Sequence, residues 1–105
     1  MDTLKRLEQV IAERRDASPD SSYVAKLNAS GIEKIAQKLG EEAVEAVIAS
    51  LSGSREELVG ESADLLFHLL VLLQARRIKL DEVLAELDQR EGVSGLDEKA
   101  SRSAN

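Results

Sequence analysis

Apolar residues recur every three or four positions along most of the chain, which is the spacing of amphipathic helices. The first such stretch predicts a helix over about residues 2–15. Its apolar positions are Leu4, Leu7, Val10 and Ile11. Residues 16–22 carry Asp, Ser and Pro and are typical of a loop, and residues 23–29 could form a short helix.

Two long helices are predicted next, each with its own start signal. The segments Ser30 to Glu33 and Ser54 to Glu57 have the spacing of capping boxes, and they predict helices over about 31–51 and 55–77. Only Ser52-Gly53 separates the two periodic stretches. Because so short a connection reverses the chain at once, we expect the two long helices to be antiparallel neighbours.

The first long helix has more apolar surface than a single buried face requires. Besides its main apolar face it carries a second one, formed by Val44, Val47, Ile48 and Leu51. A helix on the surface of a monomer needs only one apolar face, so the second face predicts a contact with another subunit. At 105 residues the chain is also short enough that a partner would help to cover its apolar surface, which favours a homo-oligomer.

The second long helix is apolar nearly all round in its C-terminal half and therefore belongs at the centre of a bundle. It nevertheless carries Glu61, Asp64 and His68. Asp64 stands among leucines, where we expect it to be buried and either neutralised or paired with a cation, because an isolated buried carboxylate is strongly disfavoured. For His68 we favour a buried imidazole hydrogen-bonded to Asp64 over a metal ligand.

Carboxylates occur in matching pairs on the two long helices. Glu42 and Glu45 are three residues apart, as are Glu61 and Asp64, so the members of each pair lie on one helix face. If the helices pack antiparallel, four carboxylates converge, and ligands that are all oxygen suit Mg²⁺ far better than Zn²⁺. The competing interpretation is that these acids are simply solvated.

Two glycines and the C-terminal segment each allow two interpretations. Gly40 and Gly60 each precede a carboxylate pair inside a helix, and close helix packing is a safer explanation for them than ligand access. A last helix is expected over 80–90, with its acidic first turn at the positive end of the helix dipole. Residues 91–105 are poor in apolar side chains and resemble a mobile tail, although their Gly, Lys and Arg residues could also surround a phosphate.

Composition supports a single all-α domain over residues 1–105. Aromatic residues make up 2% of the chain, and a single Pro is present, which favours helix over sheet. The net charge of −6 argues against nucleic acid or an anionic membrane as partner. The chain lacks Cys, and its N-terminal stretch does not resemble a signal peptide, so we expect a cytoplasmic protein. With a single His placed in a core helix, covalent catalysis is not expected.

The acidic motif resembles a known superfamily. Glu41-Glu42-x-x-Glu45, a gap of 15 residues and then Glu61-x-x-Asp64 is similar to the signature of the all-α nucleotide pyrophosphohydrolases related to the MazG proteins. More narrowly, the segments 22–27, 38–42, 61–70 and 90–102 resemble the phosphoribosyl-ATP pyrophosphohydrolase family of histidine biosynthesis. The last of these segments, Arg-x-Gly-x-Ser-Gly-x-x-Glu-Lys-x-x-Arg, is the one that selects this family within the superfamily.

The resemblance implies a MazG-like bundle of four to five helices, assembled as a homodimer, that hydrolyses phosphoribosyl-ATP to phosphoribosyl-AMP and pyrophosphate. It implies Mg²⁺ as cofactor, held by Glu42, Glu45, Glu61 and Asp64, with Glu41 orienting water or supporting the ligands. It also implies that cationic and hydroxyl side chains hold the substrate phosphates: Lys38, Arg90, Ser94, Lys99 and Arg102. Two alternatives are a MazG-like enzyme that clears (deoxy)nucleoside triphosphates and a non-catalytic helical dimerisation module.

Overall fold

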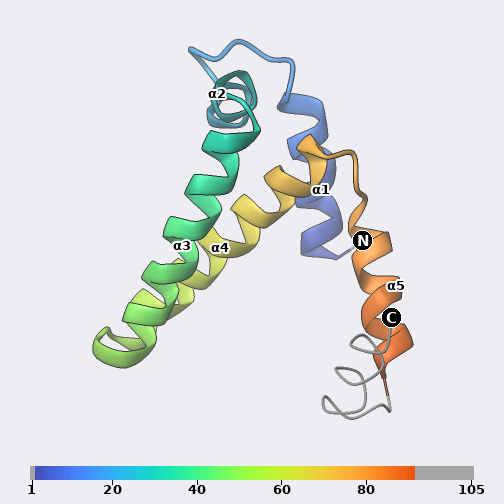
Figure 1. Cartoon of the computed structure of the whole chain (residues 1–105). Coiled ribbons are helices and arrows are strands. Elements are labelled where there is room, and N and C mark those ends of the chain that lie inside the picture. Colours follow the sequence, from blue (N-terminus) through green and yellow to red (C-terminus); the bar gives the residue numbers. More distant parts are fainter. Residues whose placement is uncertain (1, 92–105) are drawn as a thin grey trace.

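The computed structural model describes residues 2–91, and these residues form five helices with no strand among them (Figure 1). The helices are α1 (Thr3–Arg14), α2 (Tyr23–Ser30), α3 (Ile32–Ser52), α4 (Arg55–Ala75) and α5 (Leu80–Arg90). The all-α prediction is confirmed. Each predicted helix is present, with ends within about two residues of those expected, which is the ordinary uncertainty of helix boundaries.

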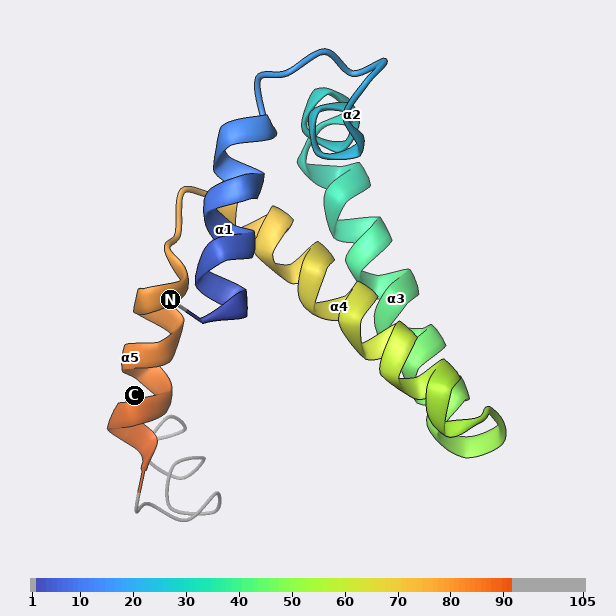
Figure 2. The ribbon, with the colours of Figure 1, turned by 180° about the vertical axis from the view of Figure 1, so that it is seen from behind.

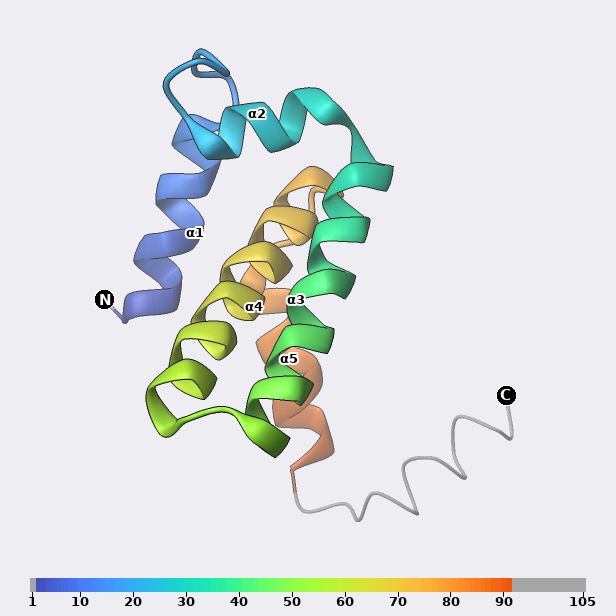
Figure 3. The ribbon, with the colours of Figure 1, turned by 90° about the vertical axis from the view of Figure 1, so that its left-hand side faces the viewer.

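Helices α3 and α4 run antiparallel and pack against each other (Figure 3), and they diverge away from the turn that joins them. The turn between them is tight at Gly53, where an added Cβ would lie 2.9 Å from the carbonyl oxygen of Ala49. Any other residue would therefore push the turn open. Ser54 begins α4 as predicted, because its hydroxyl accepts a hydrogen bond from the Glu57 backbone N–H at 3.1 Å.

The start of α3 differs from the prediction. Ser30 is the last residue of α2, and its hydroxyl donates to the Lys26 carbonyl at 2.8 Å instead of capping the next helix. The N-cap of α3 is Gly31, with φ 96° and ψ 167°, a conformation that side chains with a Cβ scarcely adopt. Gly31 makes the sharp corner that lets α2 cross the end of α3 (Figure 3), so the capping-box spacing at Ser30 was misleading.

One apolar cluster includes residues from all five helices. Its buried members are Ile11, Val24, Leu27, Ile35, Leu70, Val71 and Leu80. The cluster lies where α1 and α2 pack against the C-terminal half of α4 and the N-terminal half of α3, as the view from behind also shows (Figure 2). The C-terminal half of α4 is thus central, as its apolar sequence predicted, while the other ends of α3 and α4 project from the core.

Two further predictions concern α3 and α4. The close-packing explanation of Gly40 and Gly60 is wrong within residues 2–91, because a Cβ added at either position would meet nothing within 4 Å. Among these residues α4 alone is long and apolar enough to pass a length and hydropathy test for a membrane span. A span would place Glu61 and Asp64 in hydrocarbon, at high cost, whereas here α4 packs against α3.

Candidate metal centre

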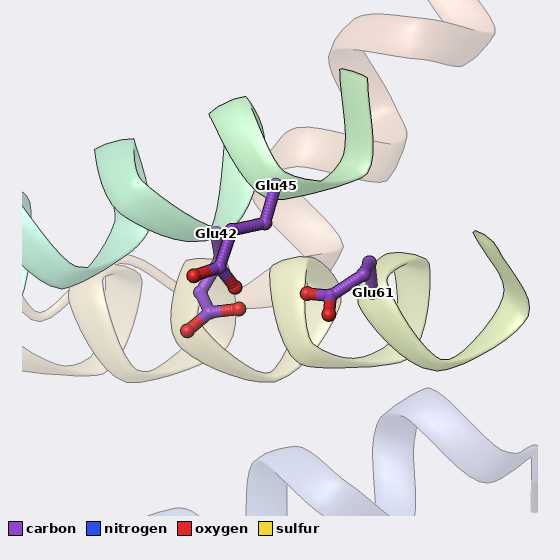
Figure 4. Close-up of side chains that lie close together, drawn as sticks. All are labelled: Glu42, Glu45 and Glu61. Atoms are coloured by element: carbon purple, nitrogen blue, oxygen red, sulfur yellow. The ribbon is translucent and has the colours of Figure 1, made fainter. Parts of the chain in front are cut away.

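Three carboxylates meet between the two antiparallel helices. Glu42 and Glu45 come from α3 and Glu61 comes from α4, and each offers one oxygen within 4.8 Å of those of the other two (Figure 4). The close approach follows from the tight α3–α4 turn, which sets residues equally far from it opposite one another. The predicted convergence of acids from both helices is therefore seen for these three residues, which we call the carboxylate group.

Two oxygens of the carboxylate group are buried and lack a partner. Oε2 of Glu42 and Oε2 of Glu61 have no hydrogen-bond partner among the described residues, and the Glu42 residue is only 8% exposed. A buried acceptor left unpaired costs about 1–3 kcal/mol, and more when it is charged. Such oxygens fit a hard divalent cation, because Mg²⁺ and Ca²⁺ take carboxylate oxygens as ligands.

The electrostatics of the carboxylate group point in the same direction. Burial and then the neighbouring Glu45 carboxylate raise the pKa of Glu42 above its ordinary value. Burial and the adjoining Glu45 also raise the pKa of Glu61. Both shifts mean that the protein alone disfavours the ionised forms of Glu42 and Glu61. A cation between α3 and α4 would offset the repulsion among the carboxylates, which the described side chains do not fully offset.

Asp64 lies at the rim of the carboxylate group and not inside it. The prediction that Asp64 is buried is wrong for the single chain, in which this residue is exposed. Its apolar neighbours do not all face the core, since Leu66 is itself 44% exposed. Asp64 is still near enough for its charge to raise the pKa of both Glu42 and Glu61.

Glu41 and Lys38 lie outside the carboxylate group, on the exposed side of α3. The Glu41 carboxylate accepts a hydrogen bond from Gln37 Nε2 at 2.9 Å and pairs with Lys38 Nζ at 3.4 Å. These two contacts, with the Gln37 bond the larger effect, hold the pKa of Glu41 below its ordinary value. Glu41 is therefore a charged partner for Lys38, and Lys38 remains partly exposed beside the acids.

His68 is buried and hydrogen-bonded near Asp64, but to a different atom from the one predicted. Its Nδ1 lies 2.8 Å from the backbone carbonyl oxygen of Asp64, and its Nε2 lies 2.9 Å from the hydroxyl of Tyr23. The sequence argument missed the Tyr23 contact, because α2 and α4 are far apart along the chain. The only local feature that set Tyr23 apart was its position directly after Ser22, the capping residue of α2.

A small hollow of about 200 Å³ opens beside the carboxylate group at the α3–α4 turn. Glu45 and Glu61 line it, and Glu57 adds a further acid that sequence reasoning treated only as a helix-start residue. A larger hollow of about 490 Å³ lies between α1 and the start of α5 and contains none of the three carboxylates. The larger hollow is therefore not the candidate metal site. The unpaired oxygens of Glu42 and Glu61 mark the site instead.

The predicted phosphate contacts near the C-terminus are only partly described. Arg90 ends α5, and its Nε donates to Glu86 Oε1 at 3.2 Å. Ser94, Lys99 and Arg102 lie outside the described residues. The structure consequently does not test their proposed contact with substrate.

The fold and the carboxylate group define an all-α protein with an acidic candidate metal centre between two antiparallel helices. The family model described as phosphoribosyl-ATP pyrophosphohydrolase matches residues 4–91. The chain therefore belongs to the phosphoribosyl-ATP pyrophosphohydrolase family, a family of hydrolases, and the family predicted from the motifs is confirmed.

Curated relatives agree with the family match over nearly the full chain. The phosphoribosyl-ATP pyrophosphatase of Erythrobacter litoralis is 72% identical over 102 residues, which are 97% of this chain and 98% of the relative. That of Novosphingobium aromaticivorans is 66% identical over 95% of this chain and 94% of the relative. That of Rhodobacter capsulatus is 56% identical over 97% of this chain and 99% of the relative.

Replacing Glu42 by Gln should stabilise the metal-free protein at pH 7, because it removes a buried charge that burial disfavours and Glu45 repels. Folding raises the pKa of Glu42 above its ordinary value of 4.5. Protonated Glu42 therefore favours the folded state at low pH, and this stabilisation is lost as the pH rises above about 4.5 and the side chain ionises. Urea unfolding in EDTA between pH 4 and 8 measures both effects.

The same variant should lose the stabilisation that Mg²⁺ gives to the unsubstituted chain, since a ligand that binds only the folded state stabilises it. Glu13→Gln, on an exposed position of α1, is the control and should behave as the unsubstituted chain. If Glu42→Gln is less stable than the unsubstituted chain in EDTA, the Glu42 carboxylate has a partner that the structure does not show.

Proposed function

We propose that this chain hydrolyses phosphoribosyl-ATP to phosphoribosyl-AMP and pyrophosphate, with Mg²⁺ as cofactor, in the cytoplasmic synthesis of histidine. The family match and the relatives support the substrate and the reaction. The observation that carries the metal is the pair of buried oxygens on Glu42 of α3 and Glu61 of α4 that have no hydrogen-bond partner within residues 2–91.

In this proposal Glu42, Glu45, Glu61 and Asp64 hold the metal. Glu42 is buried and anchors the site, while Glu45 is exposed and borders the hollow at the α3–α4 turn, so the site is open on that side. An open side is what a catalytic metal site needs to admit water and substrate. Bound Mg²⁺ would neutralise charge on the phosphates and on the departing pyrophosphate.

Cationic side chains around the acids would hold the phosphates. Among the described residues Lys38 is the candidate on α3, the helix that carries Glu42 and Glu45, and its ammonium pairs with Glu41. Glu41 thus supports the site through Lys38, in keeping with a role outside the ligand set. The remaining proposed contacts come from the C-terminal residues Arg90, Ser94, Lys99 and Arg102.

Glu45→Gln and Asp64→Asn should lower turnover on the order of 100-fold or more, because even partners outside the ligand set cost 10–100-fold when lost. Both residues are exposed, so neither change should alter the far-ultraviolet circular dichroism spectrum. Glu13→Gln is again the control and should keep full activity. Pyrophosphate release from phosphoribosyl-ATP is the readout, and full activity in either site variant would contradict the ligand assignment.

The same assay separates the alternatives. The protein is given phosphoribosyl-ATP and each (deoxy)nucleoside triphosphate in turn, with Mg²⁺. We expect the highest kcat/KM for phosphoribosyl-ATP. A preference for deoxynucleoside triphosphates would favour a nucleotide-clearing enzyme, and no pyrophosphate from any nucleotide would favour a non-catalytic helical module.

We further propose that two copies pair through the second apolar face. Its residues Val44, Val47, Ile48 and Leu51 are 55–83% exposed in the single chain, and Val59 of α4 is 64% exposed. Clustered exposed apolar surface of this kind is typical of an interface. The proposed face also lies on the same two helices as the carboxylate group, so pairing would help to hold the projecting ends of α3 and α4.

Val47→Lys should convert the protein from a dimer into a monomer at micromolar concentration, because it places a charge at the centre of the apolar face. Val10→Lys is the matched control, since Val10 is a 40% exposed apolar residue on α1 and outside this face. Sedimentation velocity distinguishes the two species. A monomeric native protein, or a dimer that survives Val47→Lys, would refute pairing through this face.

A further inference from the structure

The chain contains one Tyr and one His, and they are hydrogen-bonded to each other beside the carboxylate group. Tyr23 is the first residue of α2, and His68 lies in the buried part of α4. Neither residue is needed in the proposed ligand set or in the phosphate contacts. The contact joins α2 to α4 at the turn of α4 that follows Asp64.

The hydrogen bonds fix which imidazole nitrogen carries the proton. A carbonyl oxygen can only accept, so the nitrogen that faces the Asp64 carbonyl, Nδ1, must carry a hydrogen and donate it. In the neutral ring Nε2 is then bare and accepts the Tyr23 hydroxyl hydrogen. The order of donation is therefore from Tyr23 O–H to His68 Nε2, and from His68 Nδ1–H to the Asp64 carbonyl.

Packing holds the two rings in this arrangement. The Tyr23 ring stacks on Phe67 with centroids 6.0 Å apart, and His68 lies edge-on to both rings. His68 is 5% exposed, so it cannot reorient without disturbing its surroundings. The imidazole therefore links the half-exposed Tyr23 of α2 on one side to the backbone of α4 on the other.

This link lies beside two of the proposed metal ligands, Asp64 and Glu42. Through the Asp64 carbonyl it fixes the turn of α4 that presents Asp64, one turn after Glu61. The imidazole also lies close enough to Glu42 that, in its protonated form, it would offset part of the rise in the pKa of that residue. Glu42 and Asp64 come from different helices, and His68 is positioned to influence both.

We propose that Tyr23 and His68 are positioning residues for the metal centre: by tying the turn of α4 that carries Asp64 to α2, they set the affinity of the centre for a divalent cation. This inference rests on the proposed function, because it assumes that the carboxylates bind a metal. The pair acts through Asp64 and stands outside the proposed ligand set. Outer partners of this kind typically change metal affinity 10–100-fold.

The native protein allows a direct test, because its only imidazole gives an unambiguous nuclear magnetic resonance signal. The ¹⁵N spectrum should show the Nδ1–H tautomer in the metal-free protein. Adding Mg²⁺ should move the imidazole ¹⁵N resonances, since Asp64 and Glu42 adjust around the cation. An Nε2–H tautomer, or imidazole resonances that do not shift at saturating Mg²⁺, would overturn the inference.

Tyr23→Phe removes the hydroxyl and keeps the ring that stacks on Phe67. Its affinity for Mn²⁺, measured from the electron paramagnetic resonance of the free ion, should fall about 10-fold, while a role of Tyr23 in stability alone predicts no such loss. Gln74→Met is the matched control, because it removes another hydrogen bond of α4, from Arg15 Nη1 at 3.2 Å, far along the helix from the acids.

The combined results separate this inference from the proposed function. Weaker Mn²⁺ binding in Tyr23→Phe with native-like binding in Gln74→Met supports the positioning role. Equal losses in both variants, or none in Tyr23→Phe, overturn it even if the native protein binds Mn²⁺ and releases pyrophosphate. If the native protein neither binds Mn²⁺ nor hydrolyses phosphoribosyl-ATP, the proposed function fails and this inference with it.

Discussion

Repulsion among like charges held between two packed helices is the constraint on which the rest of this structure depends. Glu42, Glu45 and Glu61 present oxygens within 4.8 Å of one another, and two of those carboxylates have a buried oxygen that finds no partner in the described part of the chain. The arrangement is unfavourable for the protein alone, as the raised pKa values of Glu42 and Glu61 show. It becomes favourable when a divalent cation lies between α3 and α4, because that cation supplies the missing positive charge.

The remainder of the fold keeps these acids together against their repulsion. The tight turn at Gly53 holds α3 and α4 in register, and the apolar cluster anchors their opposite ends through α1 and α2. The acids lie between those two points, where the packing of α3 against α4 opposes their repulsion. Stability and affinity are therefore opposed in the metal-free protein: the packing that disfavours charged carboxylates is also what preorganises them for a cation.

The sequence was sufficient to predict elements whose cause is local. Apolar periodicity located all five helices, and the motif spacing placed Glu42, Glu45 and Glu61 on facing sides of an antiparallel pair. Features decided by tertiary contacts were not predictable in the same way. Ser30 has the sequence of a cap, yet a sharp corner at Gly31 moved the helix start. Asp64 stands among apolar residues, yet in the single chain that side of α4 is uncovered.

The partner of His68 shows the same limit. An imidazole four residues after an aspartate predicted a contact within α4, and the structure does place its Nδ1 on Asp64, at the backbone. Nothing local could indicate that Tyr23, 45 residues earlier, completes the contact from α2. Only the fold brings these two residues together, which is why the positioning role could be inferred from the structure and not from the motifs.

Crystals of the protein soaked in Mn²⁺ give the most direct test of whether the carboxylate group is a metal site. Anomalous scattering at the manganese edge should show an ion among the carboxylates of Glu42, Glu45 and Glu61, with oxygen ligands from both α3 and α4. A map without anomalous density between these helices at saturating Mn²⁺, or with the ion bound elsewhere on the chain, would contradict the account.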